Sequence, residues 1–129
     1  NASGGGLVSG IALAVKHHFP EAQVMTAEPA GFDDHARSFR SGGRERNNQA
    51  TGSICDALMA ATPGQLTFEI SSRLVGAGVS ATDEEVARAV AFAFEVLAGR
   101  VDLKDKLAVL VLSGGNVDAD TFARCLAAA

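Results

Sequence analysis

The sequence predicts an α/β fold with a mostly parallel sheet, and both its pattern and its composition lead to this prediction. Helical apolar patterns alternate with short apolar runs of strand length along the 129 residues, which is the order found when helices cover a parallel sheet. The hydrophobic residues, 47% of the chain, are mostly Ala, Val and Leu, with seven Phe and no Trp or Tyr. Such an aliphatic composition suits helices packed on a sheet better than an aromatic β-sandwich.

The helices are predicted from the spacing of apolar residues. In the first of them, Leu7, Ile11 and Val15 recur at helical spacing, and Pro20 ends the segment. The predicted helices cover residues 7–18, 33–41, 53–60, 66–75, 82–97 and 118–126.

Acidic and hydroxyl side chains mark three of these helix starts. Asp33 and Asp34 are favourable in a first helical turn because of the helix dipole. Thr82-Asp83-Glu84-Glu85 fits a capping box, and Asp118 is a suitable N-cap.

Two short apolar runs are predicted to be strands. Residues 23–27 form the first, closed by Glu28-Pro29, and residues 106–112 form the second, followed by a loop that starts at Ser113. Residues 40–51 are polar and rich in Gly and Asn, which predicts an exposed loop. Ligands of parallel sheets bind at the carboxyl ends of strands, so the loops after both strands are candidate ligand sites.

Charge and cysteine content narrow the functional classes. The net charge is −4 without a basic block, which argues against a nucleic-acid surface. Cys55 and Cys125 lie far apart and outside any CxxC pair, so free thiols in a reducing compartment are expected. The longest apolar stretch is too short to cross a bilayer. A soluble cytoplasmic protein without nucleic-acid or membrane partners is therefore expected.

The run Ser3-Gly4-Gly5-Gly6, directly before the first helix, is the strongest candidate ligand loop. Its small side chains let backbone N–H groups converge on one point, where the helix dipole adds positive potential, and this combination binds phosphate. A glycine run before a helix is also often a tight turn. A second glycine element, residues 112–118, follows the second predicted strand and favours the ligand interpretation.

Taken together, several motifs resemble the serine/threonine dehydratase and serine racemase family, which are pyridoxal-phosphate enzymes of fold type II. They occur in the family's order and roughly at its spacing. The motifs are Ser3-Gly4-Gly5-Gly6-Leu7-Val8-Ser9-Gly10-Ile11, Ala27-Glu28-Pro29, Ile54-Cys55-Asp56-Ala57-Leu58, Thr82-Asp83-Glu84-Glu85-Val86 and Leu112-Ser113-Gly114-Gly115-Asn116-Val117-Asp118. The resemblance implies a three-layer, tryptophan-synthase-β-like fold. It covers only the family's C-terminal part, so residues 1–129 are expected to be the C-terminal part of the large cofactor-binding lobe, an incomplete fold.

The resemblance also assigns roles to residues that would bind pyridoxal 5'-phosphate. The amides of Ser3, Gly4, Gly5 and Gly6 would hold its phosphate, and Leu7 would begin the helix whose dipole supports that anion. The hydroxyl of Ser113 would bond the pyridine nitrogen. Without the resemblance, Ser113 would be a turn serine.

A divalent-metal site is implied in the same way. Glu28 and Asp34, with the backbone carbonyl of Phe32, match the metal ligands of many relatives. Carboxylates and carbonyls suit Mg²⁺ or Ca²⁺. Taken alone, two acids in a loop are more often solvated or capping groups.

The activity that the resemblance implies is the dehydration and deamination of L-threonine or L-serine to a 2-oxo acid and ammonia, by a homodimer. Serine racemase and β-hydroxyaspartate dehydratase are alternatives within the family, and a non-catalytic phosphate-ligand-binding module is an alternative of another class. The family's Schiff-base lysine belongs to a segment not matched here, and Lys16, Lys104 and Lys106 do not fit its motif. No catalytic residue is therefore assigned.

The match has one internal gap. Relatives carry a further strand and helix between the positions that match Leu97 and Ala98, which are adjacent here. Either the protein has lost this strand and helix or the sequence omits them, and a missing segment of the second kind is expected between residues 97 and 98.

Overall fold

The computed structural model describes residues 1–100, 104, 109 and 116–128. The chain divides into two compact units, residues 1–82 and residues 83–129. The predicted strand 106–112 and the ligand residue Ser113 fall almost entirely on positions outside the described residues.

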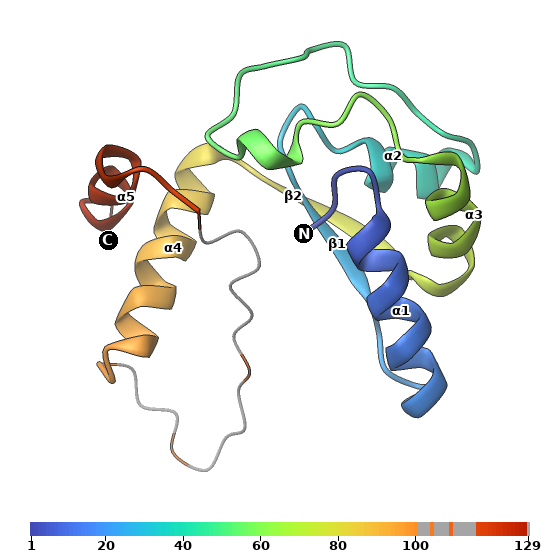
Figure 1. Cartoon of the computed structure of the whole chain (residues 1–129), viewed down its shortest axis with the longest axis horizontal. Helices are drawn as coiled ribbons and strands as arrows, with labels where there is room; N and C mark the ends of the chain where they lie inside the picture. The colour runs from blue at the N-terminus through green and yellow to red at the C-terminus, as the bar shows by residue number, and fades with distance from the viewer. Residues whose placement is uncertain (101–103, 105–108, 110–115, 129) are drawn as a thin grey trace. The chain divides into compact units, whose positions relative to one another are not determined.

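The first unit is built around a two-stranded parallel sheet (Figure 1). Its elements are α1 (Gly6–His18), β1 (Met25–Pro29), α2 (Asp34–Ser41), the 3-10 turn η1 (Asp56–Leu58), α3 (Gln65–Leu74) and β2 (Ala77–Ala81). The two strands pair in parallel from Met25 opposite Ala77 to Pro29 opposite Ala81. The predicted α/β class with a parallel sheet is confirmed.

Small aliphatic side chains hold this unit together. Ala2, Val8, Ala12 and Val75 form a buried cluster, in which α1 packs on α3. α2 packs on both strands. The segment before α1 also joins the sheet region, because the amide of Ala2 donates to the carbonyl of Ala27 in β1 at 3.2 Å.

The strand β2 was not predicted, because nearly all of its side chains are small. Gly78 lies in the middle of the strand and faces α2, where an added Cβ would lie 2.6 Å from the Cβ of Ala36. Glycine permits this close approach of helix and strand but removes the apolar side chain that normally signals a buried strand.

The existence of β2 also corrects the end of the first strand. Glu28 and Pro29 were expected to close it, whereas they belong to β1 because they pair with Ser80 and Ala81. The carbonyl of Ala81 then accepts the amide of Ala30 at 2.8 Å.

One further prediction between α2 and α3 is corrected. The helix expected over residues 53–60 is reduced to η1, where the Asp56 carboxylate accepts the amide of Ala57 at 2.7 Å and so competes with helical backbone bonding. The exposed segment expected over residues 40–51 is confirmed, with Asn47 as its one buried residue.

The second unit contains α4 (Asp83–Leu97) and α5 (Ala119–Leu126). Phe94 and Phe122 meet edge to face, with ring centroids 6.1 Å apart. Asp118 is confirmed as the N-cap of α5, since its carboxylate accepts the amide of Thr121 at 2.8 Å.

The end of α4 has a regular helix-stop geometry. Gly99 takes a φ of 72°, and the amides of Gly99 and Arg100 return to the carbonyls of Val96 and Glu95. This bond pattern is a Schellman motif. Leu97 and Ala98 are continuous within it, and the missing segment expected between them stays a prediction.

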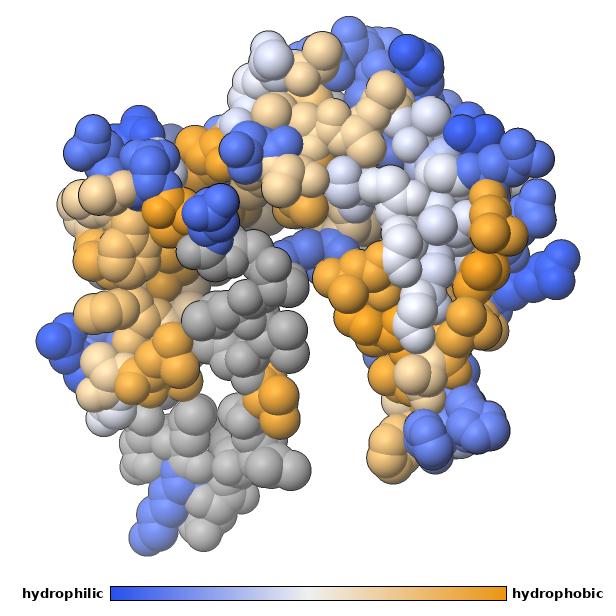
Figure 2. Space-filling model, in the orientation of Figure 1, coloured by the Kyte–Doolittle hydropathy of each residue, from blue (hydrophilic) through white to orange (hydrophobic). Residues whose placement is uncertain are grey.

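Large apolar side chains remain exposed on both units, and Figure 2 shows apolar surface on each of them. On α1 they include Leu7, Ile11 and Leu13, and on α4 they include Phe92 and Leu97. Among the described residues, none of the helices has both the length and the apolar character needed to span a membrane.

Candidate anion-binding loop and acidic pocket

The run Ser3-Gly4-Gly5 forms a tight loop that leads directly into α1. Gly5 is the N-cap residue of α1 and has a φ of 90°. A Cβ at this position would lie 2.8 Å from the His35 ring carbon Cε1 and 2.9 Å from the Thr67 hydroxyl oxygen. Gly5 is therefore required both by its backbone conformation and by its neighbours.

The carbonyl groups of this loop all have partners inside the first unit. The Ser3 carbonyl lies 2.9 Å from Nε2 of His35. The Gly4 carbonyl accepts the Gly64 amide at 3.0 Å and the Thr67 hydroxyl at 2.5 Å. The Gly5 carbonyl accepts the amide of Ser9 at 3.0 Å, the first bond of α1.

Unlike the carbonyl groups, the amide groups of the same loop have no hydrogen-bond partner among the described residues. Within the described part of the chain, no acceptor contacts the amides of residues 3–8. The first amides of a helix have no partner within it and carry the positive end of its dipole. No acidic residue lies in the first turn of α1, so the loop offers several unpaired donors and no competing carboxylate.

Glu28 lies at the end of β1 and is almost fully buried. Its two carboxylate oxygens accept the amides of His35 and Ala36 at 2.8 and 2.9 Å, so this side chain caps the N-terminus of α2. Burial raises the pKa of Glu28 to about 7, against the opposing effect of these two hydrogen bonds, and the neighbouring Asp34 carboxylate raises it further.

Asp34 begins α2 and is also buried. Its Oδ1 accepts the side-chain amide of Asn47 at 2.7 Å. Its Oδ2 has no hydrogen-bond partner among the residues described. Burial raises the pKa of Asp34 as well.

The structure thus places the predicted metal ligands Glu28 and Asp34 at one end of α2, next to the buried residue Phe32. Metal binding by these groups stays a prediction. Nowhere in the described ranges do three or more His, Cys, Asp or Glu side chains gather as a metal site, and the expected site has only two such side chains plus a carbonyl.

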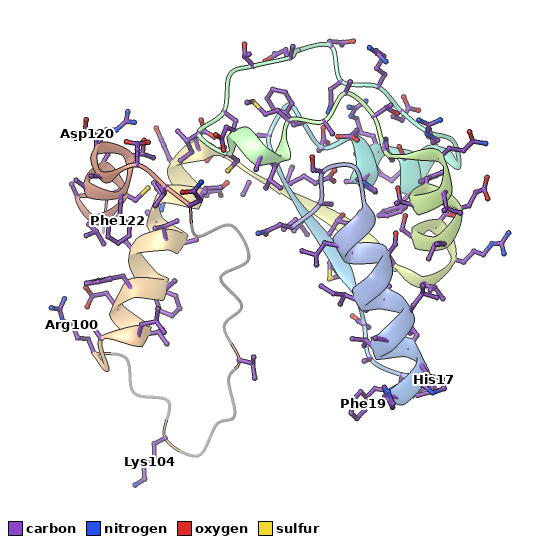
Figure 3. All side chains as sticks on the ribbon, in the orientation of Figure 1. His17, Phe19, Arg100, Lys104, Asp120 and Phe122 are labelled. Carbon is purple, nitrogen blue, oxygen red and sulfur yellow. The ribbon has the colours of Figure 1, made fainter. Side chains whose placement is uncertain are left out.

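The three histidines differ in their exposure to solvent. His17 and His18 are exposed at the C-terminal end of α1, where cationic side chains are favourable, and Figure 3 shows His17 there beside Phe19. His35 is fully buried, and burial lowers the pKa of its ring.

Sequence reasoning missed three residues that shape this region. His35 and Thr67 contact the glycine loop, and Asn47 donates to the buried Asp34 carboxylate. His35 lies four residues before Phe39, and its ring faces Phe39 at 5.8 Å, so helical spacing could have assigned it to the buried face. The sequence offers no comparable signal for the contact between Thr67 and Gly4, which are 63 positions apart.

The parallel sheet and the glycine loop define an α/β protein with a candidate anion-binding loop at the N-terminus of α1. A family model described as pyridoxal-phosphate dependent enzyme matches residues 1–99. The chain belongs to this family.

Several curated proteins are similar to the chain over most of its length. L-threonine ammonia-lyase of Thermotoga maritima is 30% identical, with 95% of this chain and 34% of that protein aligned. Phenylserine dehydratase of Ralstonia pickettii is 35% identical, with 95% and 43% aligned. The chain therefore spans about a third to two fifths of the length of these relatives.

Solved structures give the same fold. A threonine deaminase from T.th. has a TM-score of 0.67 and 28% identity, covering 78% of this chain and 35% of that one. Maize serine racemase has a TM-score of 0.63 and 34% identity, covering 78% and 29%. These neighbours confirm the expected fold type II and the incomplete extent of the chain.

Proposed function

We propose that this chain is part of a pyridoxal-phosphate enzyme that dehydrates and deaminates L-threonine or L-serine to a 2-oxo acid and ammonia. Support comes from the family match over residues 1–99 and from similarity to a threonine ammonia-lyase and a phenylserine dehydratase. The observation that carries the proposal is the glycine loop, whose carbonyls are engaged within the protein while its amides meet no described acceptor.

The residues of this loop fit a phosphate group. In this proposal the amides of Ser3, Gly4, Gly5 and Gly6 bind the cofactor phosphate, and Leu7 starts the helix whose dipole favours the anion. A Cβ added at Gly4 or Gly6 would meet no atom within 4 Å, so space for a ligand lies beside both residues.

When bound, pyridoxal phosphate supplies an electron sink that stabilises negative charge at the substrate α-carbon. We propose that Ser113 hydrogen-bonds the pyridine nitrogen, on the basis of the family resemblance alone, because Ser113 lies outside the described residues. A neutral serine would leave that nitrogen largely unprotonated and so moderate the sink. A weaker sink favours prompt loss of the β-hydroxyl.

We further propose that Mg²⁺ or Ca²⁺ binds through Glu28, Asp34 and the carbonyl of Phe32. The donor set suits a hard cation. The Oδ2 of Asp34 has no partner among the described residues, and burial raises the pKa of Glu28, so a bound cation would favour the ionised form of both carboxyl groups. Bound metal would tie the end of β1 to the start of α2.

The other expectations complete the proposal. The chain would form the C-terminal part of the large cofactor-binding lobe of a cytoplasmic homodimer. The exposed apolar residues on both units support docking against further protein, since contiguous apolar surface usually marks an interface.

The test uses the full-length protein that contains this segment, loaded with pyridoxal phosphate. We expect L-threonine or L-serine to yield a 2-oxo acid and ammonia in equal amounts. A serine racemase would instead form D-serine in excess of 2-oxo acid, and a β-hydroxyaspartate dehydratase would turn over only that substrate. Binding of phosphate ligands without any turnover would favour the non-catalytic module and overturn the proposal.

A further inference from the structure

His35 is a fully buried side chain that the proposed function does not use. It lies in the first turn of α2, where its ring packs against Phe39, which in turn stacks on Phe68 at 6.2 Å between centroids. Its Nε2 lies 2.9 Å from the carbonyl oxygen of Ser3. Its Nδ1 has no partner among the residues described.

The partner of Nε2 determines the form of the ring. A carbonyl oxygen can only accept a hydrogen bond, so Nε2 must carry a proton and donate it to Ser3. The ring therefore acts as a fixed donor, held in place by the aromatic side chains around it.

Thr67 and Gly64 do the same for the next peptide group. Both lie at the start of α3, and they donate to the Gly4 carbonyl from the Thr67 hydroxyl at 2.5 Å and the Gly64 amide at 3.0 Å. Thr67 is itself tied to α1, because its carbonyl accepts the hydroxyl of Ser9 at 3.0 Å.

The direction of each carbonyl determines the direction of an amide. In a planar trans peptide the C=O of one residue and the N–H of the next point in opposite directions. When His35 holds the Ser3 carbonyl inward, the amide of Gly4 points outward. When Thr67 and Gly64 hold the Gly4 carbonyl, the amide of Gly5 points outward as well.

We propose that His35 and Thr67 are positioning residues for phosphate recognition: they hold the Ser3 and Gly4 carbonyls and thereby aim the Gly4 and Gly5 amides at the phosphate monoester of the ligand. This inference rests on the proposed role of the glycine loop. It assigns to His35 and Thr67 a function that acts through the loop backbone.

The experiment compares two ligands that differ only in phosphate. Equilibrium dissociation constants of pyridoxal phosphate and pyridoxal are measured on the full-length apoprotein. Because the ring and the aldehyde are shared, the ratio of the two constants isolates recognition of the phosphate. The variants are Thr67→Val, which removes the hydroxyl at nearly constant volume, Thr67→Ser, which keeps it, His35→Phe and His35→Gln.

We expect Thr67→Val and His35→Phe each to reduce the preference for pyridoxal phosphate roughly 3- to 10-fold, the range for one lost neutral hydrogen bond. Pyridoxal affinity should stay unchanged. Thr67→Ser should keep the preference, and His35→Gln should keep more of it than His35→Phe because an amide can donate. His18→Phe, which replaces an exposed histidine at the far end of α1, is the matched control and should behave as wild type.

The same measurements separate a failure of the glycine-loop proposal from a failure of the positioning role. If the wild type binds both ligands equally, the proposed role of the glycine loop is wrong. If the wild type prefers pyridoxal phosphate and Thr67→Val keeps that preference, the positioning role is wrong. A parallel loss of affinity for both ligands also overturns it, because that is what general destabilisation produces. If His35→Phe does not fold, the Thr67→Val and Thr67→Ser pair decides.

Discussion

The N-termini of α1 and α2 lie in the same unit and differ in what meets their first amides. At α2, the Glu28 carboxylate accepts the amides of His35 and Ala36, so an internal anion occupies the positive end of the helix. At α1, no described side chain accepts the loop amides, and the first turn has no acidic residue. The fold therefore satisfies the first amides of α2, whereas the first amides of α1 stay free of any described acceptor, which is what the proposed phosphate site requires.

The same comparison explains why the two starts have different residues. Capping the N-terminus of α2 from within the protein requires one acidic side chain at the right place, and Glu28 on β1 supplies it. An external anion needs close access to the backbone, which the three glycines at residues 4–6 permit. Substitutions at either helix start should therefore have different effects.

A side chain introduced at the N-terminus of α1 should have the largest effect on stability and cofactor affinity. Gly5→Ala places a Cβ 2.8 Å from the His35 ring at a φ of 90°, so we expect a loss of about 1–3 kcal/mol in unfolding free energy from backbone strain, with more from the clash. Cofactor affinity should fall with it, as measured by chemical denaturation and by titration with pyridoxal phosphate.

Gly10→Ala is the matched control. Gly10 lies inside α1 with no atom within 4 Å of an added Cβ, so the change should stabilise the protein by about 0.5–1 kcal/mol. Equal effects of the two substitutions would contradict the special role of Gly5.

Titration of Glu28 at the N-terminus of α2 should make the unfolding free energy depend on pH. Because the pKa of Glu28 is about 7 in the fold and 4.5 as its ordinary value, the unfolded chain releases this proton first as the pH rises. The unfolding free energy should therefore fall by up to about 3 kcal/mol between pH 4.5 and pH 7 and then level off.

Glu28→Gln should remove this slope, as measured by urea denaturation between pH 5 and pH 8 without divalent cations. His35 acts in the opposite direction, because its lowered pKa makes stability fall as the pH drops below about 6.5. That contribution is common to both proteins, so the difference between wild type and Glu28→Gln isolates Glu28. Parallel pH profiles would show that Glu28 does not titrate as stated.

Metal binding would turn the α2 terminus into a second ligand site. We expect Mg²⁺ to raise the Tm, because a ligand of the folded state at 100 times its Kd stabilises by about 2.7 kcal/mol. The shift should grow from pH 6 to pH 8, since the cation needs Glu28 ionised and its pKa is about 7.

Glu28→Gln with Asp34→Asn should abolish the shift. Glu21→Gln with Glu69→Gln removes the same charge from exposed positions and should leave it intact. An unchanged Tm in the wild type at pH 8, or a full shift in the Glu28 and Asp34 double variant, would refute the metal site.

The smallest effect is expected from Ser113, the proposed partner of the pyridine nitrogen. Ser113→Ala removes one neutral hydrogen bond to the pyridine nitrogen, so we expect retention of pyridoxal phosphate to weaken by roughly 2- to 10-fold. Phosphate recognition by the α1 terminus should be unaffected, as shown by an unchanged affinity for inorganic phosphate. Cofactor retention and turnover equal to wild type would make Ser113 a turn residue only.

Local signals predicted much of the helical structure. The starts of α1, α2 and α5 agree with the predictions within one residue, at the glycine run, at Asp33-Asp34 and at Asp118. These signals work because helix starts are decided by the few amides and side chains of the first turn. The glycine loop was found for the same reason.

The sequence by itself determined five of the six predicted helices, the class of fold and the candidate phosphate loop, since each depends on periodicity or on neighbours within about four residues. Only the tertiary structure decided the rest. β2 forms because β1 provides a parallel partner, although Gly78 interrupts the apolar pattern that would mark it as a strand. Glu28 became a helix cap, and His35 and Thr67 reached the carbonyls of Ser3 and Gly4 from 32 and 63 positions away. Contacts at such separations depend on how helices pack on the sheet, which no local pattern encodes.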